Sequence, residues 1–156
     1  MNLHTLGLNH DSAPVEVREK IAFSPSSVPI ALSSFAQSFP SSEIVILSTC
    51  NRVEIYATSP DDSLDKETLL DFFSAFHGLP KEEFANHMYH HQGINAVRHL
   101  FFVASSLNSG VLGETQIISQ VKEAYMTATT AEITGSILNQ LFQRSLNVAK
   151  DVHTKT

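Results

Sequence analysis

Two strand-like runs flank the only cysteine of the chain. These two runs constrain the fold more than any other feature of the sequence. Residues 43–49 read EIVILST, a continuous run rich in β-branched residues that is typical of a strand buried on both faces. Residues 52–57, RVEIYA, then alternate strictly, so that Arg52 and Glu54 face the side opposite to Val53. Two such runs separated by a short polar stretch predict an antiparallel hairpin.

The remaining pattern places this hairpin inside a larger sheet. The order of strands and helices over residues 1–92 is β-α-β-β-α-β, which is the ferredoxin-like split motif. From residue 93 onward three helical patterns follow one another. We therefore predict an α+β domain over residues 1–156, with a ferredoxin-like antiparallel sheet in 1–92 and a C-terminal group of helices in 93–156. The expected elements are strands at 2–9, 43–49, 52–57 and 86–90, and helices at about 24–39, 65–78, 94–107, 114–129 and 132–152.

Single residues set the expected limits of two of these helices. Ser24 or Ser26 can cap the first helix, Ile30, Leu32, Phe35 and Phe39 are its apolar positions, and Pro40 ends it. The second helix carries phenylalanines on one face, and Gly78 is expected at its C-cap.

The composition indicates a globular protein and argues against a secreted or membrane-spanning one. With 156 residues and 42% hydrophobic side chains, the chain is long enough to bury a core. Its N-terminus lacks a signal-peptide pattern, and its apolar runs are too short to span a bilayer, so we expect a cytoplasmic protein. The net charge of −6 and the ten scattered Lys and Arg residues argue against a basic patch for nucleic acid.

The residues around Cys50 have two interpretations. In the structural one, Asn51 adopts the left-handed conformation that a tight hairpin needs, and Cys50 is an inert neighbour. In the functional one, Cys50 is an accessible thiol at a strand end, and the cation of Arg52 favours its thiolate. The spacing by itself leaves both open.

The histidines of the chain are candidates for a catalytic base or for metal ligands. A nucleophilic cysteine needs a base, and His99 lies in the middle of a predicted helix, although nothing local pairs it with Cys50. His87, His90 and His91 lie close together in the sequence and could bind zinc, but their spacing is not that of a helical metal motif. We expect no metal.

A third polar group follows two glycines in NSGVLGETQIISQ, residues 108–120. Glu114 falls in the first turn of a predicted helix, and Gln116 and Gln120 share one helix face. The stretch is either an ordinary helix start with a solvated face or the wall of a polar pocket.

Three blocks together resemble the N-terminal catalytic domain of glutamyl-tRNA reductase. They are GLNHDSAPVEVREKIAF, LSTCNRVEIYA and HLFFVASSLNSGVLGETQIISQVKEAY, and the resemblance covers essentially the whole chain. It implies that Cys50 is the nucleophile and that His99 assists it. It also implies a substrate-binding set. The members of this set are Thr49, Asn51, Arg52, Ser109, Glu114, Thr115, Gln116 and Gln120. Asn108 and Gly110 depart from the family pattern beside this set.

The family resemblance implies a redox function for the longer protein. Cys50 would attack the ester of glutamyl-tRNA, and NADPH would reduce the resulting thioester to glutamate-1-semialdehyde in tetrapyrrole (porphyrin) biosynthesis. Family members continue into an NADPH-binding and a dimerisation domain, form homodimers and can pass their product to the next enzyme of the pathway. We expect both domains to be absent here, because no G-x-G-x-x-G follows a strand and the last predicted helix runs nearly to the end of the chain. Without a bound NADPH, this piece would form and hydrolyse the thioester only.

Two alternatives remain from the residues alone. One is a cysteine-dependent esterase or hydrolase that uses Cys50 and His99 on an ordinary ester or amide. The other is a non-catalytic interaction module in which Cys50 is structural.

Overall fold

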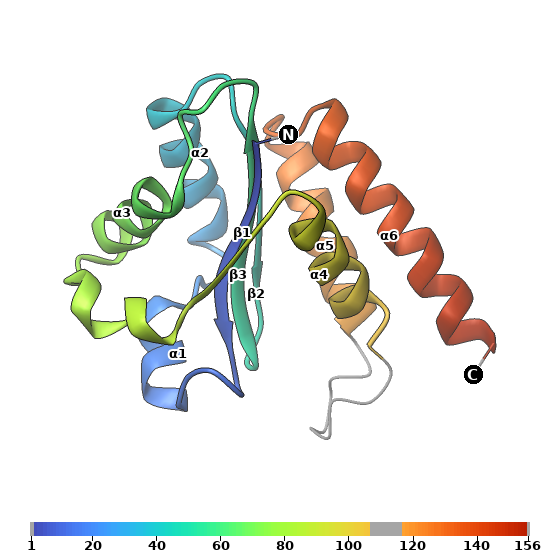
Figure 1. The fold of residues 1–156 in the computed structure, drawn as a ribbon, viewed down its shortest axis with the longest axis horizontal. Coiled ribbons are helices and arrows are strands. Elements are labelled where there is room, and N and C mark those ends of the chain that lie inside the picture. Colours follow the sequence, from blue (N-terminus) through green and yellow to red (C-terminus); the bar gives the residue numbers. More distant parts are fainter. Residues whose placement is uncertain (1, 107–116, 156) are drawn as a thin grey trace.

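A four-stranded antiparallel sheet lies between two layers of helices in the computed structural model, which describes residues 2–106 and 117–155 (Figure 1). The order across the sheet is β2-β3-β1-β4, and every neighbouring pair is antiparallel. The strands are β1 (Asn2–Asn9), β2 (Glu43–Ser48), β3 (Arg52–Ser59) and β4 (Tyr89–Gln92).

This order confirms the predicted α+β, ferredoxin-like arrangement. β1 and β2 are separated in the sheet by β3, and β3 and β4 are separated by β1, so two split β-α-β units interlock. The hairpin of β2 and β3 is paired from Glu43 with Thr58 down to Ser48 with Val53.

Helices cover both faces of the sheet, as Figure 1 shows with the early helices on one side and the late ones on the other. The first layer contains α1 (Val15–Ile21), α2 (Val28–Ser38) and α3 (Lys66–His77). The second layer contains α4 (Ile94–Ala104), α5 (Ile117–Thr130) and α6 (Ser136–Lys155). Two short 3₁₀ turns, η1 (Lys81–Glu83) and η2 (Ala85–His87), lead from α3 to β4.

Because both faces are covered, the central strands are buried on both sides. All eight residues of β3 are buried, and so are the six inner residues of β1. β2 also has four consecutive buried residues although it lies at the edge of the sheet, since α2 and α5 pack against it. This confirms the prediction made from its continuous apolar run.

Helix α3 illustrates how local sequence sets the limits of an element. The Asp65 side chain accepts a hydrogen bond from the backbone N–H of Thr68, and the Thr68 hydroxyl accepts one from the backbone N–H of Asp65, which is a capping box. At the other end Gly78 has a φ of 65°, as predicted for its C-cap.

Several predicted limits were wrong. The first crossover contains two helices instead of one. Ser27, rather than Ser24 or Ser26, occupies the N-cap position of α2 and makes no side-chain capping hydrogen bond, and Ile30 is exposed instead of packed. β4 begins at Tyr89 instead of residue 86, because pairing with β1 and not local propensity selects its residues. α6 begins at Ser136, because Glu132 has a φ of 59° and interrupts the helical pattern that starts there.

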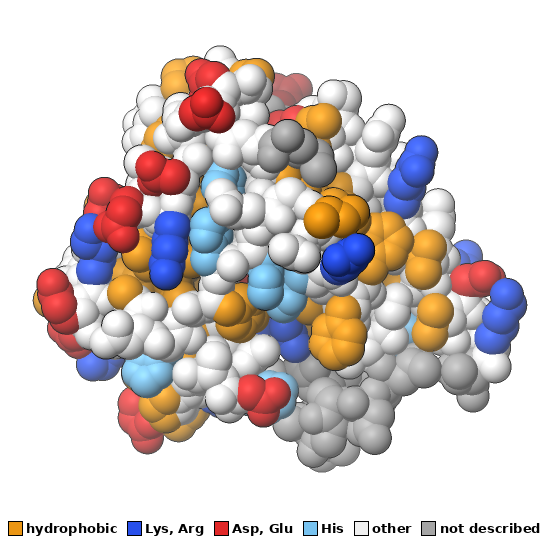
Figure 2. Space-filling model, in the orientation of Figure 1, with side chains coloured by type: hydrophobic (Ala, Val, Ile, Leu, Met, Phe, Trp, Pro, Cys, Tyr) orange, Lys and Arg blue, Asp and Glu red, His pale blue; other side chains and the backbone are white. Residues whose placement is uncertain are grey.

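The surface divides by chemistry. Figure 2 shows hydrophobic side chains gathered over α4 and α6, with acidic side chains concentrated toward α3. The exposed large apolar residues of α4 and α6 are Ile94, Phe102, Ile137 and Val148. Over the described ranges, no helix combines the length and the apolar character that crossing a bilayer requires.

Candidate active site

Cys50 lies at the tip of the β2–β3 hairpin, and its side chain is exposed. The Thr49 side chain holds the turn, because its Oγ1 accepts hydrogen bonds from the backbone N–H groups of Asn51 (3.1 Å) and Arg52 (3.2 Å). The Thr49 backbone N–H also donates to the Arg52 carbonyl at 2.8 Å. The accessible thiol agrees with the functional interpretation of this stretch.

The structural interpretation of this stretch required a left-handed Asn51, and that part of it is wrong. Among the described residues other than glycine, only Glu132 has a positive φ. The Thr49 hydroxyl satisfies two backbone donors in the turn, so the turn closes without a left-handed residue. Asn51 is buried instead, which fits a role for its side chain beyond making the turn.

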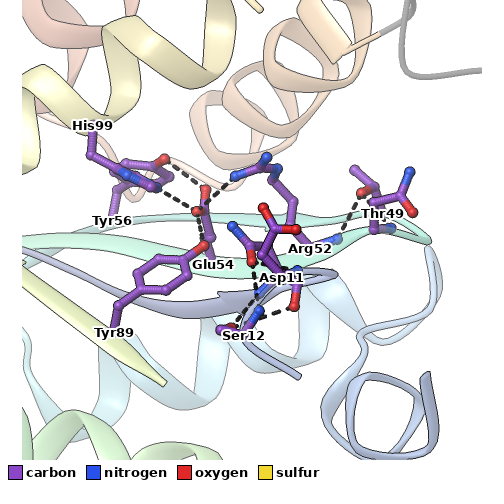
Figure 3. A network of polar contacts seen from close by, with 10 residues as sticks. Asp11, Ser12, Thr49, Arg52, Glu54, Tyr56, Tyr89 and His99 are labelled. Carbon is purple, nitrogen blue, oxygen red and sulfur yellow. Dashed lines mark hydrogen bonds and ion pairs between the residues drawn. The ribbon is translucent and has the colours of Figure 1, made fainter. Parts of the chain in front are cut away.

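A fully buried carboxylate, Glu54, lies on the same face of β3 as Arg52 (Figure 3). Its Oε1 accepts a hydrogen bond from the Tyr56 hydroxyl at 2.7 Å. Its Oε2 accepts from Arg52 Nη1 at 3.2 Å, from His99 Nε2 at 2.5 Å, and from the Tyr89 hydroxyl. One carboxylate thus gathers donors from β3, β4 and α4.

These donors keep Glu54 ionised. Burial alone would raise the pKa of its carboxyl, but the hydrogen bond from His99, the charge of its imidazole when that ring is protonated, the charge of Arg52 and the hydrogen bond from Tyr89 outweigh burial and lower that pKa to about 2. Burial, followed by the neighbouring Glu54 charge, raises the pKa of both the Tyr56 and Tyr89 hydroxyls. The two tyrosines therefore remain neutral donors.

Gly7 makes this meeting possible. It pairs with Glu54 on one side of β1 and with Tyr89 on the other, so it lies directly between them. A Cβ at Gly7 would approach Glu54 Cγ to 2.7 Å and would also overlap the Val53 carbonyl oxygen. The missing side chain lets the Tyr89 hydroxyl reach Glu54 across the strand.

The candidate nucleophile, Cys50, lies in the turn, whereas the candidate base, His99, lies on α4. Arg52 stands between the turn and the Glu54–His99 pair in Figure 3. Cys50 itself lies in the turn between Ser48, the last residue of β2, and Arg52, the first residue of β3. No hydrogen bond joins Cys50 to His99 in the described part of the chain.

The second predicted wall of the pocket is only partly described. Asn108, Ser109, Gly110, Glu114, Thr115 and Gln116 lie outside the described residues. Gln120 is half-buried on α5 and lines a cavity of about 250 Å³ together with Ser48, the last residue of β2. Gln120 therefore lies near the end of β2 that leads into the Cys50 turn.

The three clustered histidines point to different partners. His87 Nδ1 lies 3.2 Å from the Ser12 carbonyl oxygen, and His90 Nε2 lies 2.9 Å from His4 Nδ1. His91 stacks on His99 with ring centroids 4.7 Å apart. Within residues 2–106 and 117–155, no three His, Cys, Asp or Glu side chains are grouped so that they could hold a metal ion.

Sequence reasoning missed Glu54, Tyr56 and Tyr89. Glu54 was assigned only to the strand face opposite Val53, Tyr56 only to the alternating strand at 52–57, and Tyr89 only to a short strand. One signal was present: Arg52 and Glu54 are opposite charges two residues apart on one face of a strand, and buried charges are kept in pairs.

Comparison with known proteins identifies the family. The profile described as "Glutamyl-tRNAGlu reductase, N-terminal domain" matches residues 6–156. The glutamyl-tRNA reductases of Pseudoalteromonas translucida (strain TAC 125) and Marinobacter nauticus (strain ATCC 700491 / DSM 11845 / VT8) are each 44% identical over all 156 residues. The chain spans 37% and 36% of their lengths.

A solved structure agrees with both the family and the fold. The structure of glutamyl-tRNA reductase from Methanopyrus kandleri superposes with a TM-score of 0.80 at 34% identity. The match covers 99% of this chain and 35% of that one. The chain therefore belongs to the family of glutamyl-tRNA reductase N-terminal domains.

Proposed function

We propose that this chain performs the acyl-transfer step of a glutamyl-tRNA reductase, with Cys50 as the nucleophile and glutamyl-tRNA as the substrate. One observation carries the proposal: an exposed thiol stands at a hairpin tip, two residues from a buried arginine that a buried carboxylate holds in place. The names of the relatives supply the substrate.

The proposed step replaces an oxygen ester by a thioester. The Cys50 sulfur attacks the carbonyl carbon of the glutamyl ester, so that a C–S bond forms and the C–O bond to the tRNA breaks. The proton that the thiol loses passes through His99 to the ribose oxygen of the departing tRNA. An aminoacyl ester is already activated, and a thioester accepts hydride more readily than the ester it replaces.

Recognition of the glutamyl group is assigned to Arg52. A guanidinium presents five N–H donors in a planar fork, which matches a carboxylate in a two-point contact. Glu54 takes one hydrogen bond from Nη1 and thereby fixes the plane of the fork. We assign further substrate contacts to the predicted set. This set is Thr49, Asn51, Ser109, Glu114, Thr115, Gln116 and Gln120, with Glu114 or a glutamine receiving the substrate ammonium.

The described residues do not fit a dinucleotide. Such sites use a parallel strand followed by a glycine-rich turn and a helix N-terminus, whereas the sheet described here is wholly antiparallel. Only Gly93 of the described glycines stands between a strand and a following helix. We therefore assign NADPH-dependent reduction to glutamate-1-semialdehyde, homodimer formation and transfer to the next tetrapyrrole enzyme to the remainder of the longer relatives.

The test is the intact mass of the chain after mixing with glutamyl-tRNA at neutral pH and quenching in acid. Wild type, Cys50→Ser and His99→Asn are compared. We expect a glutamyl adduct on wild type that hydroxylamine removes, no adduct on Cys50→Ser, and slower adduct formation on His99→Asn, because the serine variant lacks the thiol and the asparagine variant lacks the base.

Other outcomes identify the alternatives. An unmodified wild-type chain with fully charged tRNA would contradict the proposal and favour a structural thiol. Discharged tRNA without an adduct would indicate hydrolysis at this site, and activity on simple esters without tRNA would indicate a general cysteine hydrolase. Oxidation of NADPH by this chain would overturn the assignment of the reduction to other parts of the protein.

A further inference from the structure

We infer that Glu54 is a positioning residue for the proposed acyl transfer: its carboxylate fixes the His99 ring so that Nδ1 is the nitrogen that exchanges the proton with Cys50 and the departing tRNA. The inference rests on the proposed function, because it assigns a role within that reaction. It concerns a residue that would not itself touch the substrate.

The tautomer of His99 follows from the chemistry of its partner. His99 Nε2 lies 2.5 Å from Glu54 Oε2, and an ionised carboxylate only accepts hydrogen bonds. Nε2 must therefore carry a hydrogen. A neutral imidazole has a single N–H, so the lone pair able to take a proton lies on Nδ1.

The carboxylate that imposes this tautomer is itself immobilised. Glu54 has no exposed surface, Tyr56 holds its Oε1 at 2.7 Å, and Tyr89 and Arg52 hold the same Oε2 that meets His99. Rotation of the carboxylate would break several of these hydrogen bonds at once in a site without solvent.

The His99 ring is also confined from its sides. His91 stacks on it at 4.7 Å between centroids with planes 30° apart, and the Tyr89 ring lies 5.2 Å away. The side chain is only 14% exposed. A ring flip would have to displace these neighbours and would bring a carbon against the buried carboxylate, so one orientation is strongly favoured.

This arrangement accounts for every proton in the step. The thiol proton moves to Nδ1 as the C–S bond forms, and the imidazolium is stabilised by the anionic Glu54 beyond Nε2. Nδ1 then gives this proton to the ribose oxygen as the C–O bond breaks. Cys50 and His99 are not hydrogen-bonded without substrate, and such contacts often form only in the substrate complex.

The first measurement is spectroscopic and independent of turnover. In nitrogen-labelled wild-type chain at neutral pH, we expect a downfield, slowly exchanging Nε2–H proton of His99, assigned by its loss in His99→Asn. In Glu54→Gln this signal should move upfield, because a neutral amide oxygen accepts less strongly than a carboxylate. The matched control is Glu43→Gln, which replaces a glutamate that accepts from the backbone N–H groups of Gly135 and Leu138.

The second measurement is a double-mutant cycle on the rate of adduct formation. We expect Glu54→Gln to slow the reaction by about tenfold or more. Rates are compared at saturating glutamyl-tRNA, so that weaker binding through Arg52, which Glu54 also holds, does not contribute. Under this condition the double variant Glu54→Gln/His99→Asn should be no slower than His99→Asn alone, because Glu54 acts on the proton transfer through His99. Glu43→Gln should react at the wild-type rate.

Each failure has its own signature. Multiplying losses in the double variant, or a His99 signal unchanged in Glu54→Gln, would overturn the positioning role even if the wild type forms the adduct. The Nε2–H signal could also behave as expected while the chain forms no adduct. That result would contradict the proposed function, and with it the catalytic part of this inference.

Discussion

Arg52 joins the proposed recognition of substrate to a buried charge network, so its geometry matters as much as its charge. Lysine at this position would keep a positive charge near Glu54 but would lose the planar fork. We therefore expect Arg52→Lys to lose most of the preference for glutamyl-tRNA over glutaminyl-tRNA, measured as the ratio of adduct-formation rates. An unchanged ratio would show that another residue reads the side-chain carboxylate.

The depressed pKa of Glu54 makes a prediction about stability in acid. A carboxyl whose pKa falls from 4.5 unfolded to about 2 folded contributes stability that is fully present above pH 4.5 and is lost as the pH falls through 2. The contribution is on the order of 3 kcal/mol. Replacement by glutamine removes the titrating group and leaves its neighbours.

Urea unfolding of wild type and Glu54→Gln at several pH values tests this. The wild type should be more stable at pH 7, and the difference in unfolding free energy should shrink between pH 4.5 and 2. Other carboxyls titrate in both proteins and cancel in the difference. A gap that is constant with pH would mean that Glu54 is not preferentially ionised in the folded state.

At the level of elements, β1 depends on the absence of a side chain at Gly7. Alanine there would push β1 away from β3, because its Cβ would overlap the Val53 carbonyl and the Glu54 side chain. We expect Gly7→Ala to destabilise the chain by about 1–3 kcal/mol in chemical unfolding. The hydrogen bond from Tyr89 to Glu54 should weaken as well, which should shift the tyrosine absorbance maximum to shorter wavelength. An unchanged unfolding midpoint would show that the strands can separate without cost.

The elements that the sequence predicted well are those with a strong local pattern. β2 and β3 follow from a continuous apolar run and a strict alternation, and α3 has a phenylalanine face with a glycine at its C-cap. α1 was missed because Ile21 is its only buried residue, which leaves little periodicity to detect. β4 reads YHHQ and becomes a strand through its partner β1.

The same distinction applies to the site. Cys50 and its turn are consecutive in the chain, so a motif of neighbouring residues reveals them. Glu54, Tyr89 and His99 are brought together by strand pairing and helix packing across residues 54 to 99. Such a network depends on the register with which β1 pairs with β3 and β4, and patterns of neighbouring residues in the sequence do not determine that register.

For the whole molecule, the charge balance limits how tightly this chain can bind the proposed tRNA substrate. It carries ten Lys and Arg residues against sixteen Asp and Glu, so only a few phosphates can be met at once. We expect weak binding of uncharged tRNA. With about three phosphate contacts the affinity should fall more than tenfold between 50 and 200 mM salt. Tight, salt-insensitive binding in a filter or fluorescence assay would contradict this expectation.

The burial of β3 on both faces has a consequence for attempts to redesign this domain. Its odd-numbered residues fill one core while Arg52, Glu54 and Tyr56 build the polar network against α4 and α6. Because β3 contributes side chains to the core on one face and to the polar network on the other, it tolerates few substitutions. A substitution that changes substrate selectivity also disturbs the packing of the core. The hairpin tip offers no easier route to a new acyl specificity, because the Thr49 hydroxyl closes the turn through two hydrogen bonds and Asn51 is buried beside the proposed nucleophile.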